Sequence, residues 1–316
     1  MLNYPKLFAQ YLLFDPSNFN RLVLNELKWF FSKYCTESNT ITKEILGSKM
    51  KLDLRNKGIS HQLFVSDVRE ISSIIIFLKT LKRGEKLLDL GANIGYYSLL
   101  GSRIVGNRGK VFSVEPDLRN FTLLEKNIEI NNPKIFETYN IAISDKSGEV
   151  EFLITQRSNV NTIYKEGINF SDSDSKIKVK SMSIDDFYFN INNFDYIRMD
   201  IEGSEVEVLK GMDKLLSSSK PLKILFETHP MYYSVERDIV PALKLLFSNG
   251  FRAKFVETSG DSDLNEIKDM GYKLSRIIKT DFFHRVIVRD LSNEDLLKLV
   301  VKHSPKSLRS IYLERS

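Results

Sequence analysis

The chain has 316 residues, of which 42% are hydrophobic and 28% are charged. This composition excludes a mainly disordered or low-complexity chain, because so much apolar surface can form one large or two modest cores. The formal charge of +5 would by itself suggest a polyanionic partner. However, the basic excess lies in residues 1–60 and 291–316, whereas residues 61–290 carry 32 basic and 33 acidic side chains.

Cysteine and histidine usage argues against disulfides and metal sites. A single cysteine, Cys35, cannot form an intramolecular disulfide. The four histidines show no metal-ligand spacing, so we expect no metal: His61, His229, His284 and His303. The first residues mix polar with apolar side chains and form no signal-peptide core, and the longest apolar run, Ile74–Leu78, is too short to cross a membrane. We therefore expect a cytoplasmic protein.

The N-terminal flank, residues 1–60, begins with two amphipathic segments. Pro5–Phe14 and Phe19–Tyr34 carry apolar residues at helical spacing, which predicts two helices. Packing against the core is the favoured interpretation, and contact with a membrane surface or a partner is the alternative, given Lys28, Lys33 and a Trp29 that looks exposed. Residues 39–60 are typical of a short connector that contains strands.

Strands and helices alternate from about residue 61. Asp67 and Glu70 indicate the start of a helix that ends near Arg83–Gly84. The elements predicted next are strand Lys86–Leu90, helix Gly95–Val105, strand Lys110–Val114, helix Asp117–Asn131 and strand Phe136–Ile143. This alternation favours right-handed βαβ units around a parallel sheet.

An insertion at about 149–182 interrupts the alternation. Glu149–Thr155 and Lys176–Met182 alternate like strands, with a long polar loop between them. The elements predicted after it are strand Tyr196–Ile201, helix Ser204–Ser217 with a capping box of Ser204 and Glu207, strand Lys223–Glu227, helix Val235–Asn249, and strands Phe251–Glu257 and His284–Arg289. Residues 291–316 are expected to form a helix, Glu294–Lys302, and a basic tail.

The segment Leu87–Gly95 is a hydrophobic strand that runs into a glycine turn and then a helix. Such a turn lets a ligand approach the backbone and leaves helix N–H groups free to bind polar atoms. Gly91 and Gly95 lack the third glycine of a dinucleotide fingerprint, which disfavours NAD and FAD. Glu115 ends the next strand, where a carboxylate holds a ribose diol.

The order of motifs resembles the FkbM family of S-adenosylmethionine-dependent methyltransferases. The resemblance covers about residues 61–290, in the blocks Leu88–Tyr97, Val114–Asp117, Ala142–Gly148, Ser183–Asp186, Arg198–Glu205 with Val208–Gly211, and Phe226–Glu227. It implies an α/β class I methyltransferase (Rossmann-like) fold with a seven-stranded sheet of order 3-2-1-4-5-7-6. Strand 7 is antiparallel and would be His284–Arg289. The cofactor implied is S-adenosyl-L-methionine.

The resemblance also implies roles for single residues at the cofactor. Asp89, Gly91, Asn93 and Gly95 would surround its methionine end. Glu115 would accept hydrogen bonds from both ribose hydroxyls, and the backbone near Ala142 would face the adenine. Glu70 matches an acidic position that reaches the amino group of the cofactor, although it could equally cap the helix that follows it.

Candidates for the reacting end lie at the carboxyl ends of the predicted strands Tyr196–Ile201 and Lys223–Glu227, and they are Asp200, Glu202, Glu227 and His229. A hydroxyl acceptor needs a base within hydrogen-bond reach, and costly carboxylates at a strand end suggest a ligand. Two of them have structural alternatives: Glu202 could cap the following helix, and His229 could be a hydrogen bonder in a loop. Arg198 is expected to pair with a neighbouring carboxylate rather than to act in catalysis.

The acceptor is expected to be a sugar, a glycolipid or another hydroxylated small molecule, methylated on oxygen. Polar side chains in the insertion would suit such an acceptor if the loop covers the site: Gln156, Arg157, Asn159, Asn161, Thr162 and Tyr164. Methylation of nitrogen, carbon or RNA, and a non-catalytic cofactor-binding protein, are the alternatives. RNA is disfavoured because the basic excess lies in the flanks, where peripheral membrane contact would also occur. The oligomeric state is left open.

Overall fold

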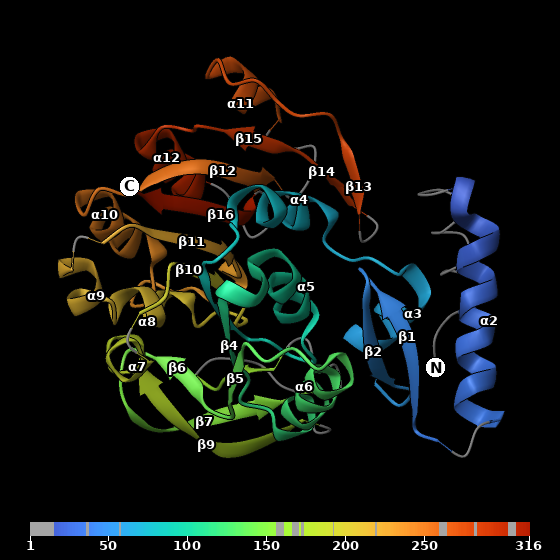
Figure 1. The fold of residues 1–316 in the computed structure, drawn as a ribbon. Coiled ribbons are helices and arrows are strands. Elements are labelled where there is room, and N and C mark those ends of the chain that lie inside the picture. The colour runs from blue at the N-terminus through green and yellow to red at the C-terminus, as the bar shows by residue number, and fades with distance from the viewer. Residues whose placement is uncertain are drawn as a thin grey trace.

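The computed structural model describes residues 16–35, 38–56, 58–155, 161–165, 171, 174–191, 193–218, 220–258, 264–280, 283–302 and 308–316. At its centre lies an eight-stranded sheet (Figure 1). From one edge to the other, its strands are β15 (Ile287–Arg289), β12 (Arg252–Thr258), β16 (Leu308–Arg315), β11 (Leu222–Glu227), β10 (Tyr196–Met199), β3 (Lys86–Leu90), β4 (Lys110–Val114) and β5 (Phe136–Tyr139). The five strands from β11 to β5 are parallel, as the alternation predicted.

The C-terminal segment corrects the expected topology. Strand β16 pairs antiparallel with both β11 and β12, so it takes the place expected for strand 7. His284–Arg289 instead contributes to β14 (Phe283–Arg285) and to β15, an eighth strand at the sheet edge. Residues 308–316 are therefore not a tail: Ile311, Tyr312 and Leu313 are fully buried. Arginines at positions 309 and 315 gave this short segment the charge pattern of a tail.

Helices cover both faces of the sheet (Figure 1). Because side chains alternate along a strand, Leu88 and Leu90 of β3 pack in one core cluster and Leu87 packs in the other. The first cluster includes residues of α7 (Ile184–Ile191), α8 (Glu205–Lys210), α9 (Asp213–Ser217), α10 (Ile239–Ser248), α11 (Leu264–Asp269) and α12 (Asn293–Lys302). The second includes residues of α2 (Phe19–Cys35), α3 (Ile59–Ser66), α4 (Ile71–Thr80), α5 (Tyr96–Val105) and α6 (Leu118–Asn131).

Helix ends differ from the sequence interpretation in two places. The predicted helix Ser204–Ser217 is two helices, α8 and α9, and its capping box is absent: the Ser204 hydroxyl makes no cap hydrogen bond, and Glu207 pairs with Arg237 at 2.7 Å. Asp67 does not begin α4 but follows the end of α3 with a φ of 65°. By contrast, Asp117 caps α6 as expected, because its carboxylate accepts a hydrogen bond from the Arg119 N–H.

The insertion forms a second sheet below the first (Figure 1). Strands β7 (Gly148–Ile154) and β9 (Ser175–Ser183) pair antiparallel, which confirms the predicted hairpin. They are joined by β6 (Ala142–Ser144) and β8 (Thr162–Ile163) in the order β6-β9-β7-β8. The predicted strand Phe136–Ile143 is thus divided between the two sheets, so the chain passes from the central sheet into the insertion at this point.

The N-terminal flank packs against the core through described contacts. A hairpin of β1 (Thr40–Ile45) and β2 (Ser48–Asp53) lies on α6, where the Asn127 and Asn131 side chains bond the β2 backbone. Helix α2 packs on α3, and its Trp29 is buried against His61, contrary to the exposed position expected. The predicted helix Pro5–Phe14 lies outside the described residues. None of the described helices is long and apolar enough to span a bilayer.

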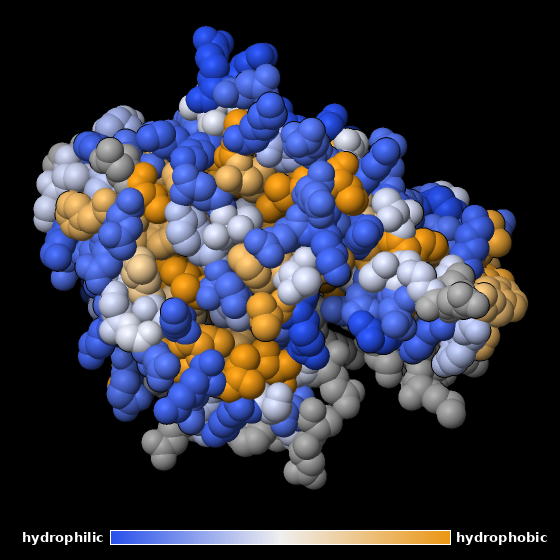
Figure 2. Space-filling view, turned by 60° about the horizontal axis from the view of Figure 1, so that its bottom comes forward, coloured by the Kyte–Doolittle hydropathy of each residue, from blue (hydrophilic) through white to orange (hydrophobic). Residues whose placement is uncertain are grey.

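One face of α2 remains exposed at the outer edge of the molecule. Five large side chains on this face are 40–67% accessible: Leu24, Leu27, Phe30, Phe31 and Tyr34. The space-filling view shows apolar residues at this edge beside hydrophilic ones (Figure 2). The favoured prediction that α2 packs on the core therefore holds for one side of the helix only.

Candidate active site

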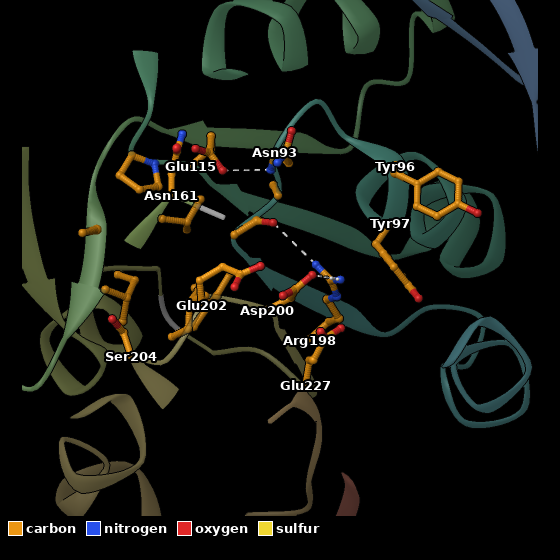
Figure 3. A pocket seen from close by; sticks show the side chains of 18 of the residues that line it. Asn93, Tyr96, Tyr97, Glu115, Asn161, Arg198, Asp200, Glu202, Ser204 and Glu227 are labelled. Atoms are coloured by element: carbon orange, nitrogen blue, oxygen red, sulfur yellow. Dashed lines mark hydrogen bonds and ion pairs between the residues drawn. The ribbon is translucent and has the colours of Figure 1, made fainter. Parts of the chain in front are cut away.

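A pocket opens at the carboxyl ends of β3, β4, β10 and β11, where parallel sheets bind ligands. It encloses about 950 Å³ including its open mouth. Eight of the predicted site residues line it: Glu70, Gly91, Asn93, Glu115, Ala142, Asp200, Glu202 and Glu227. Asp89, Gly95 and His229 do not line it. Glu115 and Asn93 lie at one end, and Asp200, Arg198 and Glu227 lie at the other (Figure 3).

The glycine turn after β3 brings two strand ends together. Gly91 has a φ of +76°, and a Cβ at this position would lie 2.0 Å from the backbone oxygen of Asp200. Only glycine fits there without moving the backbone. Gly95, with a φ of +95°, precedes α5, and a Cβ there would meet Leu124 at 2.8 Å. Gly95 therefore serves the packing of α5 against α6 rather than lining the pocket.

Glu115 lies at the end of β4 with its carboxylate held by two backbone groups. The Asn93 N–H donates to it at 2.9 Å (Figure 3), and the Asp117 N–H donates to its other oxygen at 2.9 Å. Burial raises the pKa of the Glu115 carboxyl to about 8, although these two hydrogen bonds favour the ionised form. The carboxyl thus faces the pocket in a position where a pair of hydroxyl donors would stabilise its charge.

Apolar side chains form the wall next to Glu115. Ala142 is buried and lines the pocket together with Ile141, Ile143 and Phe152. This wall joins the central sheet to the insertion, because Ala142 begins β6 and Phe152 lies in β7. A flat apolar group could lie against it, as expected for the region of Ala142.

Arg198 organises the far end of the pocket. Its guanidinium bonds Asp200 Oδ2 at 2.8 Å, lies 3.4 Å from Asp89 Oδ1, and stacks over the Tyr97 ring at 4.0 Å. Burial alone would lower the pKa of Arg198, but Asp200 and Asp89 hold it above its ordinary value. Asp89 is fully buried and also accepts a hydrogen bond from Ser98, so it holds Arg198 in place instead of lining the pocket.

Glu70 faces the pocket and does not cap α4. It has left-handed backbone geometry with a φ of 52°, and its side chain makes no cap hydrogen bond. The carboxylate accepts a hydrogen bond from the Tyr97 hydroxyl at 3.1 Å and pairs with Arg69 at 3.1 Å. The helix-cap alternative is therefore wrong, and the carboxylate belongs to the pocket wall.

The four residues predicted for the reacting end meet in space. Nε2 of His229 lies 3.2 Å from Glu227 Oε1, 3.4 Å from Glu202 Oε2 and 3.7 Å from Asp200 Oδ1. On the other side of the ring, Nδ1 lies 2.8 Å from Oε1 of the buried Glu205. His229 therefore hydrogen-bonds from the loop after β11, and the same ring also meets the carboxylates predicted for the reacting end. It lies behind the carboxylates that line the pocket, and Glu202, with a φ of +49°, does not cap α8.

The electrostatics of this cluster follow from burial and crowding. Burial raises the pKa of the Glu202 carboxyl to about 8. Burial would lower the pKa of His229, but the neighbouring Glu202 and Glu205 hold it well above its usual value. Burial would raise the pKa of Glu227, yet Arg309 and His229 hold it below its usual value. The groups in this cluster therefore depend on one another for their charge.

Two pocket residues escaped the sequence interpretation. Arg309 pairs with Glu227 and comes from β16, the strand that was taken for a tail. Tyr97 follows the glycine turn, and its side chain contacts both Glu70 and Arg198. Asn161 and Thr162 of the insertion do reach the pocket region: Asn161 donates to Asp117 at 2.8 Å and Thr162 donates to the Glu202 backbone oxygen at 2.6 Å. Gln156, Arg157 and Asn159 lie outside the described residues.

The family profile of the methyltransferase FkbM domain matches residues 89–253, which is more than half of the chain. The chain belongs to this family. Membership confirms the resemblance drawn from the motifs and the α/β class I methyltransferase fold expected from it. The matched segment ends in β12, so Arg309 and the whole of β16 lie outside it.

Three known proteins show how far the similarity of this FkbM-family chain extends. The hexuronic acid methyltransferase AglP of Haloferax volcanii is 26% identical over 157 residues, 49% of this chain and 61% of that protein. A probable cobalt-precorrin-6B C(15)-methyltransferase of Sulfolobus acidocaldarius is 32% identical over 93 residues, 27% of this chain and 48% of that protein. The crystal structure of methyltransferase FkbM from Methylobacillus flagellatus KT has 17% identity and a TM-score of 0.36, covering 74% of this chain and 56% of that one. The chain thus spans less than two thirds of each of these proteins.

Proposed function

We propose that the protein is an S-adenosylmethionine-dependent methyltransferase that methylates a hydroxyl group of a sugar, a glycolipid or another hydroxylated small molecule. One observation carries the proposal: a single pocket holds the Glu115 carboxylate at one end and the Asp200, Glu202 and Glu227 carboxylates at the other. The two ends have the chemistry that the two substrates require. The similarity to a hexuronic acid methyltransferase supports a sugar as the acceptor.

The residues present fit the cofactor. The Gly91 turn leaves no space for a side chain, so backbone borders the pocket there. Glu115 can accept hydrogen bonds from a ribose diol, and the apolar wall beside Ala142 suits an adenine ring. Glu70 would pair with the amino group of the methionine part. Asp89 acts indirectly by holding Arg198.

When bound, S-adenosylmethionine supplies a methyl group on a positively charged sulfur, and the acceptor oxygen bonds this carbon while the electron pair of the broken S–C bond returns to sulfur. The protein must align the acceptor, which can lower the barrier by roughly 7–11 kcal/mol. It must also take the hydroxyl proton. Asp200 and Glu202 line the pocket and are the candidate proton acceptors, whereas Arg198 fixes the Asp200 carboxylate through Oδ2.

The test uses a panel of acceptors with the purified protein. We expect transfer of a labelled methyl group from S-adenosylmethionine to hydroxylated sugars or uronic acids, and loss of at least 100-fold in rate for Glu202→Gln. Glu149→Gln, in an exposed part of β7, is the matched control. Transfer to RNA or to amines but not to any hydroxyl would contradict the proposed acceptor class.

Peripheral membrane contact belongs to the same proposal if the acceptor is lipid-linked. The exposed apolar face of α2 defined above, next to the basic Lys28 and Lys33, supports it. We expect the protein to float with vesicles that contain anionic lipid and Phe31→Ser to reduce this binding. If Phe31→Ser floats with the vesicles as well as the unmodified protein does, the exposed face of α2 is not the membrane contact.

A further inference from the structure

The cluster behind the pocket has the composition of a cation site, although the spacing of histidines along the chain predicted none. Asp200, Glu227 and His229 each offer one ligand atom, and the three atoms lie within 4.8 Å of one another. Glu227 ends β11 and His229 follows it by two residues, whereas Asp200 directly follows β10, so the pairing of these adjacent strands brings the three together. Sequence spacing could not reveal this set, because the pairing of two strands creates it.

The orientation of the imidazole is the second, independent observation. His229 is 97% buried, and its Nε2 contacts carboxylate oxygens at 3.2 Å and beyond but makes no well-oriented hydrogen bond among the described residues. Its Nδ1 bonds the buried Glu205 at 2.8 Å, which orients the ring and directs Nε2 toward Asp200 and Glu227. Metal-ligating histidines characteristically have their second nitrogen bonded to a carboxylate in this way.

The separations suit a small divalent ion. Two ligand atoms about 2.1 Å from one cation lie about 3.0 Å apart at a right angle and about 4.2 Å apart on opposite sides. Nε2 lies 3.2 Å from Glu227 Oε1 and 3.7 Å from Asp200 Oδ1, within this range. Arg198 takes the other oxygen of Asp200, Oδ2, and so leaves Oδ1 facing the imidazole.

The balance of charge points the same way. Four carboxylates surround His229, namely Asp200, Glu202, Glu205 and Glu227. Among the described residues, the arginines that contact these four are Arg198 and Arg309, and Arg198 also lies beside Asp89. Buried carboxylates in such excess are costly unless cations or protons compensate them.

We propose that Asp200, Glu227 and His229 bind one divalent metal ion of the Mn²⁺ type, which holds the methyl acceptor through two adjacent oxygen atoms. Carboxylate oxygens favour Mg²⁺ and Mn²⁺, and an imidazole nitrogen shifts the preference toward transition metals. Asp200 and Glu227 line the pocket while His229 lies behind them, so the open coordination positions face the acceptor. The acceptor class is then a vicinal diol or a hydroxy acid, and Glu202 remains as a carboxylate outside the ligand set. This inference rests on the proposed function for the identity of the acceptor, but the metal site itself does not.

The experiment measures Mn²⁺ binding to chelator-treated, full-length protein by electron paramagnetic resonance, with S-adenosylhomocysteine binding measured by calorimetry on the same preparation. We expect about one Mn²⁺ per chain, and at least tenfold weaker binding for His229→Gln and for Glu227→Gln. His284→Gln, at an exposed histidine of β14 outside this ligand set, is the matched control and should bind Mn²⁺ normally. Retained S-adenosylhomocysteine binding shows that each variant is folded.

Absence of Mn²⁺ binding in a protein that binds S-adenosylhomocysteine would overturn the metal site and leave the methyltransferase proposal intact. Variants that bind Mn²⁺ as tightly as the unmodified chain would overturn the ligand assignment. If S-adenosylhomocysteine fails to bind the unmodified chain while Mn²⁺ binds, the proposed function fails and the metal site stands.

Discussion

Replacement of Glu115 by glutamine tests the cofactor end of the pocket. Backbone N–H groups already donate to the two oxygens of the Glu115 carboxylate, which also faces the pocket. The two ribose hydroxyls of the cofactor would donate two further hydrogen bonds to this charged group. Such bonds contribute about 1.5–3 kcal/mol each. Glutamine keeps one neutral acceptor oxygen, so the expected loss is about 2–3 kcal/mol, or a roughly 30- to 140-fold higher Kd.

Calorimetry with S-adenosylhomocysteine measures this change directly. Glu137→Gln, on the neighbouring strand β5 and paired with Lys110 outside the pocket, removes a carboxylate without touching the site and should leave Kd unchanged. A Glu115→Gln variant that binds within threefold of the unmodified chain would refute the assignment of the ribose position.

The same carboxyl predicts a pH dependence. Its pKa of about 8 in the free protein falls when hydroxyl groups donate to the charged form, so binding below pH 8 releases a proton. Affinity should therefore rise between pH 6 and 8, by at most about tenfold per pH unit, and Glu115→Gln should remove this component. Because the folded carboxyl keeps its proton between pH 4.5 and 8 while the unfolded one loses it, the contribution of Glu115 to stability falls as pH rises through this window. If the affinity of Glu115→Gln still rises between pH 6 and 8, another group releases the proton on binding.

Three further changes test the fold around the site, each by chemical denaturation. Gly91→Ala should lower the free energy of unfolding by about 2–5 kcal/mol, because the added Cβ would meet the Asp200 backbone. Gly84→Ala is the control: Gly84 has a φ of +87° but open space around it, so the loss should be only about 1–2 kcal/mol. Equal losses would contradict the close approach of Gly91 to Asp200. Ile311→Ala should cost about 2–5 kcal/mol because β16 is a buried strand, and a loss under 0.5 kcal/mol would return this segment to a tail. Asp117→Ala should lower the free energy of unfolding by about 0.5–2 kcal/mol, because α6 loses its N-terminal cap. Ser204→Ala should lower it by less, because the Ser204 side chain makes no cap hydrogen bond. A larger loss for Ser204→Ala than for Asp117→Ala would support the predicted capping box.

Local patterns predicted most of the central sheet. The bounds of β3 and β4 agree with the prediction, because each is a short apolar strand between a glycine or lysine turn and an amphipathic helix. The four candidates for the reacting end also meet as predicted, since parallel strands bring their carboxyl ends to one edge. Where the apolar pattern of a segment agrees with its place in the parallel sheet, the sequence alone predicts the element correctly.

The errors have a common physical origin in long-range contacts. Residues of β16 form a strand because they pair with β11 and β12, which precede them by about 50 or more residues. The charged sequence of β16 alone does not indicate a strand. Asp89 follows the family motif, but Ser98 and Arg198 hold it away from the pocket. Arg309 reaches Glu227 only because β16 pairs with β11, so its place in the pocket had no signal in residue spacing.

A crystal structure of the protein with S-adenosylhomocysteine shows whether this pocket holds the cofactor with its ribose at Glu115. The ribose hydroxyls should lie within about 3.2 Å of the Glu115 carboxylate, and the sulfur should face the side of the pocket formed by Asp200 and Glu202. A ligand bound elsewhere, or bound in this pocket with its ribose away from Glu115, would show that the pocket is not the cofactor site proposed here.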